Sequence, residues 1–270
     1  MKSAGTPIAS PIDVQLLEGT FARDGHVDAL TCRERAFVAL LAASTRPRSV
    51  YDVAESLWPD HDPESARNSA KVYASRVRWR FGRKDSICWN SAGYSLGDCV
   101  TVDIRRIEAT IARARAATVP DGRLMQDAEA ALDRIAGAPM AFRACPELER
   151  HLSGLAAGLA TVLFEGASRR GDHQRAVRAG LGLVAFDPCE ELGRELVIRG
   201  RLALGDELGA YCAFREYART LHDELDAEPS ERLRALFPTG RKYVSDTHAN
   251  TAGRARRRLH DAMIDERRGA

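Results

Sequence analysis

The sequence predicts a mainly α-helical protein with a small β component, organised as two folded units and a tail. Three observations support this prediction. Short stretches with alternating apolar residues occur in the first hundred positions. Apolar residues recur at helical spacing over most of the remaining chain, as they do in amphipathic helices. A short motif in the second half also recurs 34 residues later, which indicates a helical repeat.

Charge and composition narrow the class of protein. The 270 residues carry 40 Lys+Arg and 38 Asp+Glu, and no apolar run is as long as the roughly 18 residues of a membrane-spanning helix. Residues 1–19 lack the apolar segment of a signal peptide. The six cysteines are scattered and include no C-x-x-C, which fits free thiols in a reducing compartment. We therefore expect a cytoplasmic protein with no membrane partner.

Short strands are expected first. In "PIDVQLLEG" the apolar residues Ile12, Val14 and Leu16 alternate with other residues, which is the pattern of a half-buried strand. Asp24-Gly25 is a turn signal and precedes a second such stretch, "HVDAL".

Three helices are expected next. Thr31 and Glu34 have the T-x-x-E spacing of a capping box. Ser49 is the expected N-cap of a second helix through "VYDVAESLW", which Pro59 ends. Asp62-Pro63 opens a third helix at about residues 63–82, because Asp is a good N-cap and Pro fits the first helical position.

A hairpin completes the first unit. "SICWNSAGYSL" has two short strand patterns around the turn residues from Asn90 to Gly93. Strands, three helices and a hairpin, in this order, predict a winged helix-turn-helix over residues 10–97, with the third helix as its recognition helix.

The third helix is unusually basic. Residues Ser65 to Lys84 include five Arg and two Lys but no Asp or Glu. A helical wheel gives one apolar face to Ala66, Ala70, Tyr73, Ala74, Val77 and Phe81. A solvated basic face is the alternative, but ordinary surface helices alternate charge signs to gain ion pairs. The cations suit DNA phosphates, and the apolar Val72 on the polar face suits a thymine methyl group.

We therefore predict a DNA-binding surface on and beside this helix. Its predicted residues are Arg67, Asn68, Ser69, Lys71, Val72, Ser75, Arg76, Arg78, Arg83 and Lys84.

The stretches "LTCRERAFVALLAA", "VAESLWPDHDPESARNSAKVYASRVRWRFG" and "NSAGYSL" resemble the OmpR-type winged helix of the Streptomyces antibiotic regulatory protein family. The resemblance implies that Val72, Arg76 and Arg78 face bases or their nearest phosphates. It implies that Arg67, Asn68 and Ser69 meet backbone phosphates, and that Trp58 and Pro59 are structural. Many relatives offer a hairpin cation to the minor groove, whereas Ser86 to Leu96 contains no Lys or Arg.

Residues 98–237 are expected to form a helical, tetratricopeptide-like unit, with no strand after Asp98. "GDHQRA" from Gly171 recurs as "GDELGA" from Gly205. We expect each Gly to close a helix and Ala176 and Ala210 to let paired helices touch, so that Arg at Gly171 or Ala176 disturbs a close contact. We also expect residues 1–97 alone to contain a complete core.

"AFDP" and "ELDAEPSERLRALF" in this unit resemble the bacterial transcriptional activator domain that follows the winged helix in the same family. Residues 238–270 resemble no family known to us. Their composition predicts a basic tail that is partly ordered or disordered, with extra phosphate contact as the alternative.

The sequence contains none of the common catalytic motifs or ligand spacings, so we expect no enzyme, no metal and no cofactor. We predict a sequence-specific DNA-binding transcriptional activator. The resemblance implies direct-repeat promoter sites in double-stranded DNA, a homodimer, contact with RNA polymerase holoenzyme and target genes of secondary metabolism. A helical-repeat scaffold for protein or RNA partners is the alternative function.

Overall fold

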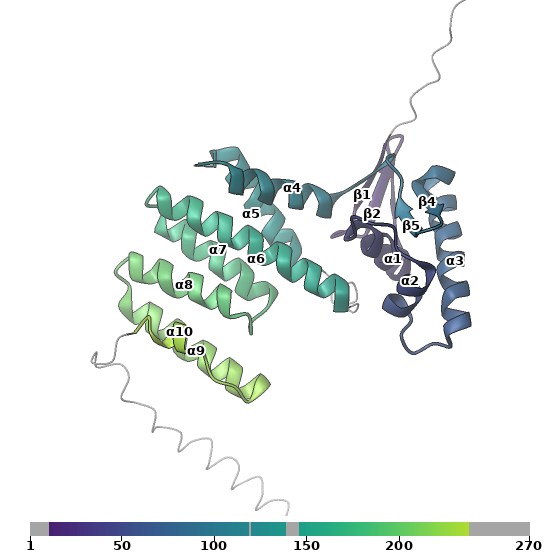
Figure 1. Ribbon diagram of the computed structural model, residues 1–270. Helices are drawn as coiled ribbons and strands as arrows, with labels where there is room; N and C mark the ends of the chain where they lie inside the picture. Colours follow the sequence, from purple (N-terminus) through teal and green to yellow (C-terminus); the bar gives the residue numbers. More distant parts are fainter. Residues whose placement is uncertain (1–10, 119, 139–145, 238–270) are drawn as a thin grey trace, which may run out of the picture.

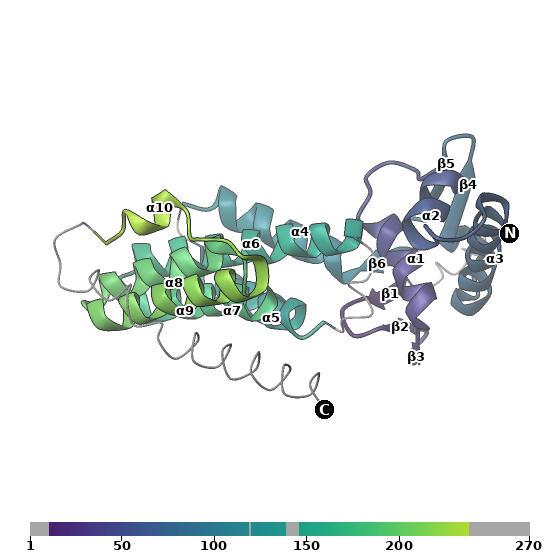
Figure 2. The ribbon, with the colours of Figure 1, turned by 90° about the horizontal axis from the view of Figure 1, so that it is seen from below.

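The computed structural model describes residues 11–118, 120–138 and 146–237. The strands and first three helices gather at one end of the molecule, and the helices from α5 (Gly122–Ala136) onward stack at the other (Figure 1, Figure 2). The basic tail expected at residues 238–270 lies outside the described residues.

A four-stranded sheet belongs to the first unit. Its strands are β1 (Ile12–Gln15), β2 (Thr20–Arg23), β3 (His26–Ala29) and β6 (Val100–Val102), in the order β3-β2-β1-β6. Strand β1 pairs antiparallel with β2 and parallel with β6. The expected turn between β2 and β3 is made by Asp24 and Gly25, at φ values of 50° and 81°.

Strand β6 corrects the sequence analysis, which expected no strand after Asp98. Val100 and Val102 are buried, and Thr101 between them is exposed. A strand of three residues is too short for its alternation to be recognised immediately before a helix. A fragment of residues 1–97 therefore lacks one strand of its own sheet, and it is not the complete core that we expected.

Three helices follow the sheet's first three strands. They are α1 (Cys32–Ala42), α2 (Val50–Leu57) and α3 (Pro63–Phe81). Both expected N-caps are present, because Thr31 accepts a hydrogen bond from the N–H of Glu34 and Ser49 accepts one from the N–H of Asp52. Both are capping boxes, and the sequence analysis identified only the first.

The expected hairpin is also present. A short 3-10 helix, η1 (Lys84–Ser86), leads into β4 (Ile87–Asn90) and β5 (Gly93–Leu96). The N–H groups of Arg48 and Tyr94 each donate to the other residue's carbonyl at 2.7 Å, which fixes β5 to the chain before α2. Gly93 is required there, because it has a φ of 132° and a Cβ would lie 2.0 Å from the carbonyl oxygen of Arg48.

The second unit is the expected stack of helices. They are α4 (Asp103–Ala116), α5, α6 (Pro146–Arg169), α7 (His173–Phe186), α8 (Glu191–Ala203), α9 (Glu207–Leu225) and the short α10 (Glu231–Arg234). Helices α6 to α9 lie side by side in chain order (Figure 1). This arrangement is tetratricopeptide-like, as the sequence predicted.

The two copies of the 34-residue repeat share the geometry of a turn between two helices. Gly171 and Gly205 follow α6 and α8 with φ values of 71° and 76°. Asp172 and Asp206 come next, with φ and ψ near −86° and 70° in the first and −83° and 68° in the second. Each Asp caps the following helix by accepting a hydrogen bond from the N–H three positions on. The two turns are therefore built alike.

The structure changes the expected role of Gly171. A Cβ there would meet nothing within 4 Å, so the expectation of a close helix contact at this residue is wrong. Glycine is favoured there because the turn requires a positive φ. The close approach of α7 and α8 lies instead at Gly180, Gly193 and Gly200, where a Cβ would lie 2.7 to 3.1 Å from a valine of the facing helix. Ala176 is completely buried, which agrees with its expected place between helices.

A buried carboxylate joins the two units. Asp103, the first residue of α4, accepts hydrogen bonds from the N–H groups of Leu16 at 3.0 Å and Leu17 at 3.1 Å, which follow β1. It also pairs with Arg134 of α5 at 2.9 Å. Burial raises the pKa of Asp103, although these hydrogen bonds and Arg134 act in the opposite direction. One apolar cluster continues from β1 to α8, so the units share a core.

A second link starts at Glu147, in the first turn of α6. Its carboxylate pairs with the side chain of Arg48 and accepts a hydrogen bond from the hydroxyl of Ser56 in α2 at 3.3 Å. Because the main chain of Arg48 also binds Tyr94, this residue connects the hairpin to the helical unit.

Candidate nucleic-acid interface

Helix α3 lies along the outer edge of the first unit, away from the helical unit (Figure 1). It begins as the sequence predicted: Asp62 caps it by accepting hydrogen bonds from the N–H groups of Glu64 and Ser65, both at 3.1 Å, and Pro63 follows. It ends at Gly82, which adopts the left-handed conformation at a φ of 62°. Local interactions fix both ends of α3, so the side chains on its surface have defined positions.

The apolar face of α3 is buried as expected. Its buried residues are Ala66, Ala70, Ala74, Val77 and Phe81, and Tyr73 is half-buried. The ring of Phe81 lies 4.9 Å from that of Phe21 in β2. Most of the buried side chains on this face are Ala or Val, and they bring α3 close to α1 and α2, which leaves the opposite face outward.

The predicted site residues lie on this outward face or at its edges. Asn68, Lys71, Val72, Ser75, Arg76 and Lys84 are exposed, whereas Arg67, Ser69, Arg78 and Arg83 are half-buried. Val72 is 52% exposed, so this apolar side chain does not enter the core. Trp79, which the site prediction did not include, is 82% exposed on the same face.

Three cations of the basic run are held by other parts of the protein, and we name them the anchored cations: Arg78, Arg80 and Arg83. The Nε of Arg78 donates to the carbonyl of Ile87 in β4 at 2.7 Å. Arg80 pairs with Asp28 of β3 at 3.1 Å and with the buried Glu34 of α1 at 3.6 Å.

Arg83 makes a two-pronged pair with Asp85, with Nε to Oδ1 at 3.0 Å and Nη2 to Oδ2 at 2.5 Å. The hydrogen bonds from Arg83 hold the pKa of Asp85 below its ordinary value, and the same bonds raise the pKa of Arg83. The charge of Arg83 is therefore balanced beside the helix end.

The other three cations of the helix, Arg67, Lys71 and Arg76, are the outer cations. Within the described residues none of them forms an ion pair with a carboxylate. The guanidinium of Arg67 lies 5.0 Å from the ring centre of Tyr51, and that of Arg76 lies 5.0 Å from the ring centre of Tyr73. Stacking of this kind orients a guanidinium without neutralising it, so these charges remain available to an anion.

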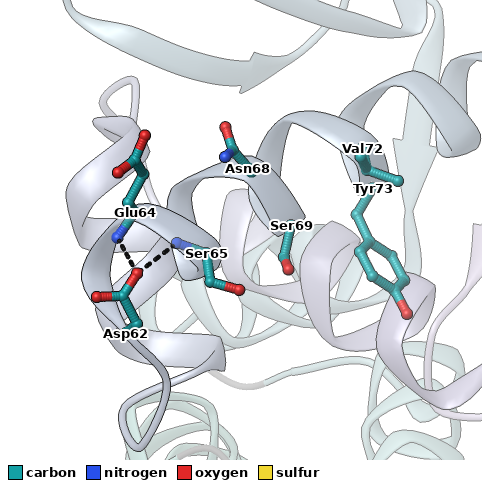
Figure 3. A pocket seen from close by; sticks show the side chains of 7 residues that line it. All are labelled: Asp62, Glu64, Ser65, Asn68, Ser69, Val72 and Tyr73. Carbon is teal, nitrogen blue, oxygen red and sulfur yellow. Dashed lines mark hydrogen bonds between the residues drawn. The ribbon is translucent and has the colours of Figure 1, made fainter.

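A shallow hollow of about 470 Å³ runs along the first turns of α3. Figure 3 shows its lining, with Asn68, Ser69 and Val72 on the helix and Asp62 and Glu64 at its start. Short amide and hydroxyl side chains beside an apolar group are the chemistry that reads base edges. Of the side chains that line the hollow, the acidic ones lie only at the helix start. The end near Val72 is therefore more suitable for DNA, whose phosphates are negative.

Sequence reasoning missed how six of the seven cations divide into anchored and outer ones. The partners of Arg78 and Arg80 lie in β4, β3 and α1, and local sequence spacing contains no signal for such contacts. The Arg83–Asp85 pair is local, and its two-residue spacing was a usable signal.

Searches of the described residues found no helix long and apolar enough to cross a membrane. They also found no group of three or more His, Cys, Asp and Glu side chains placed to hold a metal ion.

The family described as "Bacterial transcriptional activator domain" matches residues 102–239, which is just over half of the chain. The chain therefore belongs to the bacterial transcriptional activator domain family. Its architecture is that of the Streptomyces antibiotic regulatory protein family, as the sequence resemblance predicted.

Among solved structures, the chain is similar to Mycobacterium tuberculosis EmbR in complex with a low-affinity phosphopeptide. The identity is 22% and the TM-score is 0.54, with 84% of this chain and 64% of the EmbR chain covered. This likeness shows the shared fold, and the chain spans less than two thirds of EmbR. A search among curated proteins found no match.

Proposed function

We propose that this protein is a transcriptional activator that binds double-stranded DNA by placing α3 in the major groove. The observation that supports the proposal is the outward face of α3. It presents the outer cations, Asn68, Val72 and Ser75 together at the edge of the molecule. A recognition helix of a winged helix-turn-helix has this position and this chemistry.

The residues divide by role in this proposal. Arg67, Lys71 and Arg76 neutralise phosphates and release counterions, which gives affinity. Asn68 hydrogen-bonds a base edge and Val72 contacts a thymine methyl group, which gives sequence preference.

The helical unit has a different role in the proposal. It joins two copies of the chain on direct-repeat promoter sites and contacts RNA polymerase holoenzyme. The family supports this role, and so does the charge of residues 98–237, which hold 19 Lys+Arg against 23 Asp+Glu and suit DNA poorly.

The first experiment selects bound sequences from a randomised DNA library and then measures the anisotropy of a labelled selected duplex. We expect tight binding at low salt that weakens steeply as salt rises, with a slope of about −0.9 for each phosphate neutralised. A random duplex should bind more weakly with a similar salt dependence. The proposal is wrong if double-stranded RNA competes for the protein better than DNA does, or if the affinity for DNA does not change with salt concentration. Either result favours the scaffold function.

A further inference from the structure

The three tryptophans of the chain differ sharply in their surroundings. Trp58 is buried, and its ring lies 5.4 Å from that of Tyr73. Trp89 on β4 is 55% exposed, and its ring lies 4.5 Å from that of Tyr94. Trp79 is the most exposed, at 82%.

Trp79 belongs to the stripe that faces outward on α3. It follows Val72 by seven residues and Ser75 by four, and these spacings place all three on one helical face. A single exposed apolar side chain is ordinary on a protein surface. Here, however, Val72 shares the stripe at 52% exposure, so α3 exposes two apolar side chains along one line.

The backbone beneath Trp79 is held firmly. The carbonyl of Trp79 accepts the N–H of Gly82 at 3.0 Å, and the carbonyl of Arg78 accepts the N–H of Arg83 at 3.2 Å. The side chain of Arg78 also binds the hairpin at 2.7 Å. The indole therefore projects from a fixed position, with only its two side-chain torsions free.

The charge around Trp79 indicates which kind of partner its indole contacts. Residues 65–84 contain no Asp or Glu, and Asp85, the next acid in the chain, is paired with Arg83. Exposed Lys71, Arg76 and Lys84 make this end of the surface positive. A positive surface favours a polyanion over a basic or neutral partner.

The spacing along the helix identifies which part of DNA the indole reaches. Seven residues of α-helix span about 10 Å, and the major groove is about 12 Å wide. From mid-groove to either strand is about 6 Å. When Val72 faces the bases in mid-groove and α3 crosses the groove, Trp79 therefore lies over the sugar-phosphate strand. An indole suits that strand, since its face packs on deoxyribose and its N–H donates to a phosphate oxygen.

We propose that Trp79 is a DNA-contact residue that packs on the deoxyribose and phosphate at the edge of the major groove. The inference rests on the proposed function, because it places Trp79 on the DNA that α3 binds. It gives the surface an apolar anchor whose contribution does not depend on salt.

The test uses the full-length chain, its own tryptophan fluorescence and a labelled random-sequence duplex of thirty base pairs. Acrylamide quenching is measured with and without saturating duplex for the wild type, Trp79→Phe and Trp89→Phe. We expect the duplex to protect a large accessible component in the wild type and in Trp89→Phe, and to protect little in Trp79→Phe. Trp58 is buried in every variant and supplies the constant background.

Affinity supplies a second measurement. Trp79→Ala should weaken duplex binding about tenfold, as loss of an aromatic contact to nucleic acid does, with the salt slope unchanged. Leu208→Ala, which removes a 62% exposed side chain from α9, is the matched control and should bind like the wild type.

The outcomes separate this inference from the proposed function. If the labelled duplex binds but Trp79 stays as quenchable as before, the inference is wrong and DNA binding stands. If the duplex does not bind the wild type, both fail. If concentrated protein without DNA protects Trp79, the indole meets a second copy of the chain, and the inference is also wrong. The quenching measurement needs only Trp→Phe variants, so it remains decisive if Trp79→Ala folds poorly.

Discussion

The anchored cations and the outer cations lie within one basic run, yet the structure uses them differently. Arg78, Arg80 and Arg83 are bound to carbonyls and carboxylates of the hairpin, β3, α1 and η1. The outer cations lie on or beside the outward face and meet tyrosine rings or solvent. A run of positive charge in a sequence is therefore not a single functional feature. The anchored cations connect the end of the helix to the rest of the first unit, and the outer cations are available for a polyanion.

The largest expected effect is on folding, from Arg80→Ala. This change leaves the carboxylate of Glu34, which is 1% exposed, without its cationic partner. We expect the free energy of unfolding to fall by about 2–4 kcal/mol, because a buried charge is left unpaired. Urea denaturation measures it, with Arg76→Ala as the matched control that should change stability by less than about 0.5 kcal/mol. Equal stability of the two variants would show that Arg80 is not an anchor.

Arg78→Ala tests whether one residue has both roles. Losing the bond to Ile87 should cost about 1 kcal/mol of stability. An arginine has five donors, so the remaining ones are free for DNA, and binding to the selected site should weaken by about 1–3 kcal/mol if it reads a base. Anisotropy on selected and random duplexes separates these cases. Equal losses on both duplexes would remove Arg78 from the base-reading residues.

Lys71→Ala and Arg76→Ala should affect affinity and leave stability unchanged. Each should weaken selected and random DNA alike and reduce the salt slope by about 1, because each removes one phosphate contact. Arg219→Ala, which removes an exposed cation from α9, is the control and should keep the wild-type slope. A variant that loses affinity with an unchanged slope would not be a phosphate contact.

The smallest expected effect comes from removing the carboxylate that balances Arg83. Hydrogen bonds from Arg83 lower the pKa of Asp85, so the pair is intact at neutral pH and is lost only as pH falls through that lowered pKa. Asp85→Asn removes the negative charge that balances Arg83 at neutral pH. We expect few-fold tighter binding of random duplex and a salt slope steeper by about 0.9.

Asp98→Asn removes an exposed acid that lies further along the chain, and it serves as the control for Asp85→Asn. If both variants bind equally, the change in net charge explains the gain, and the charge of Asp85 beside Arg83 has no special effect.

Local chemistry explains which parts of the fold were predictable. The caps at Thr31, Ser49 and Asp62 each involve residues within three positions, so the sequence alone located all three helix starts. The 34-residue repeat was visible because both of its turns need Gly at a positive φ followed by a capping Asp. The burial of the α3 apolar face followed from the 3.6-residue period.

Long-range contacts explain what was missed. Strand β6 forms only because β1 offers it an edge, and Asp103 is buried only because Leu16 and Leu17 donate to it. No sequence pattern distinguished Arg48, although its side chain forms an ion pair with Glu147 that connects the two units. For the candidate site, periodicity identified the outward face, but only the fold separates the anchored cations from the outer ones. The roles of all ten predicted site residues toward DNA remain predictions.

The parallel pairing of β1 with β6 also determines when this protein can finish folding during synthesis. The N–H groups of Leu16 and Leu17 bond to the carboxylate of Asp103, which lies 87 and 86 positions further along the chain, respectively. At about 5–20 residues per second, a ribosome needs roughly 4–18 s to add those positions. Through that interval β1 has one unpaired edge, and three helices and a hairpin must be made before the strand that covers it. Helix α3 therefore emerges from the ribosome before the four-stranded sheet is complete.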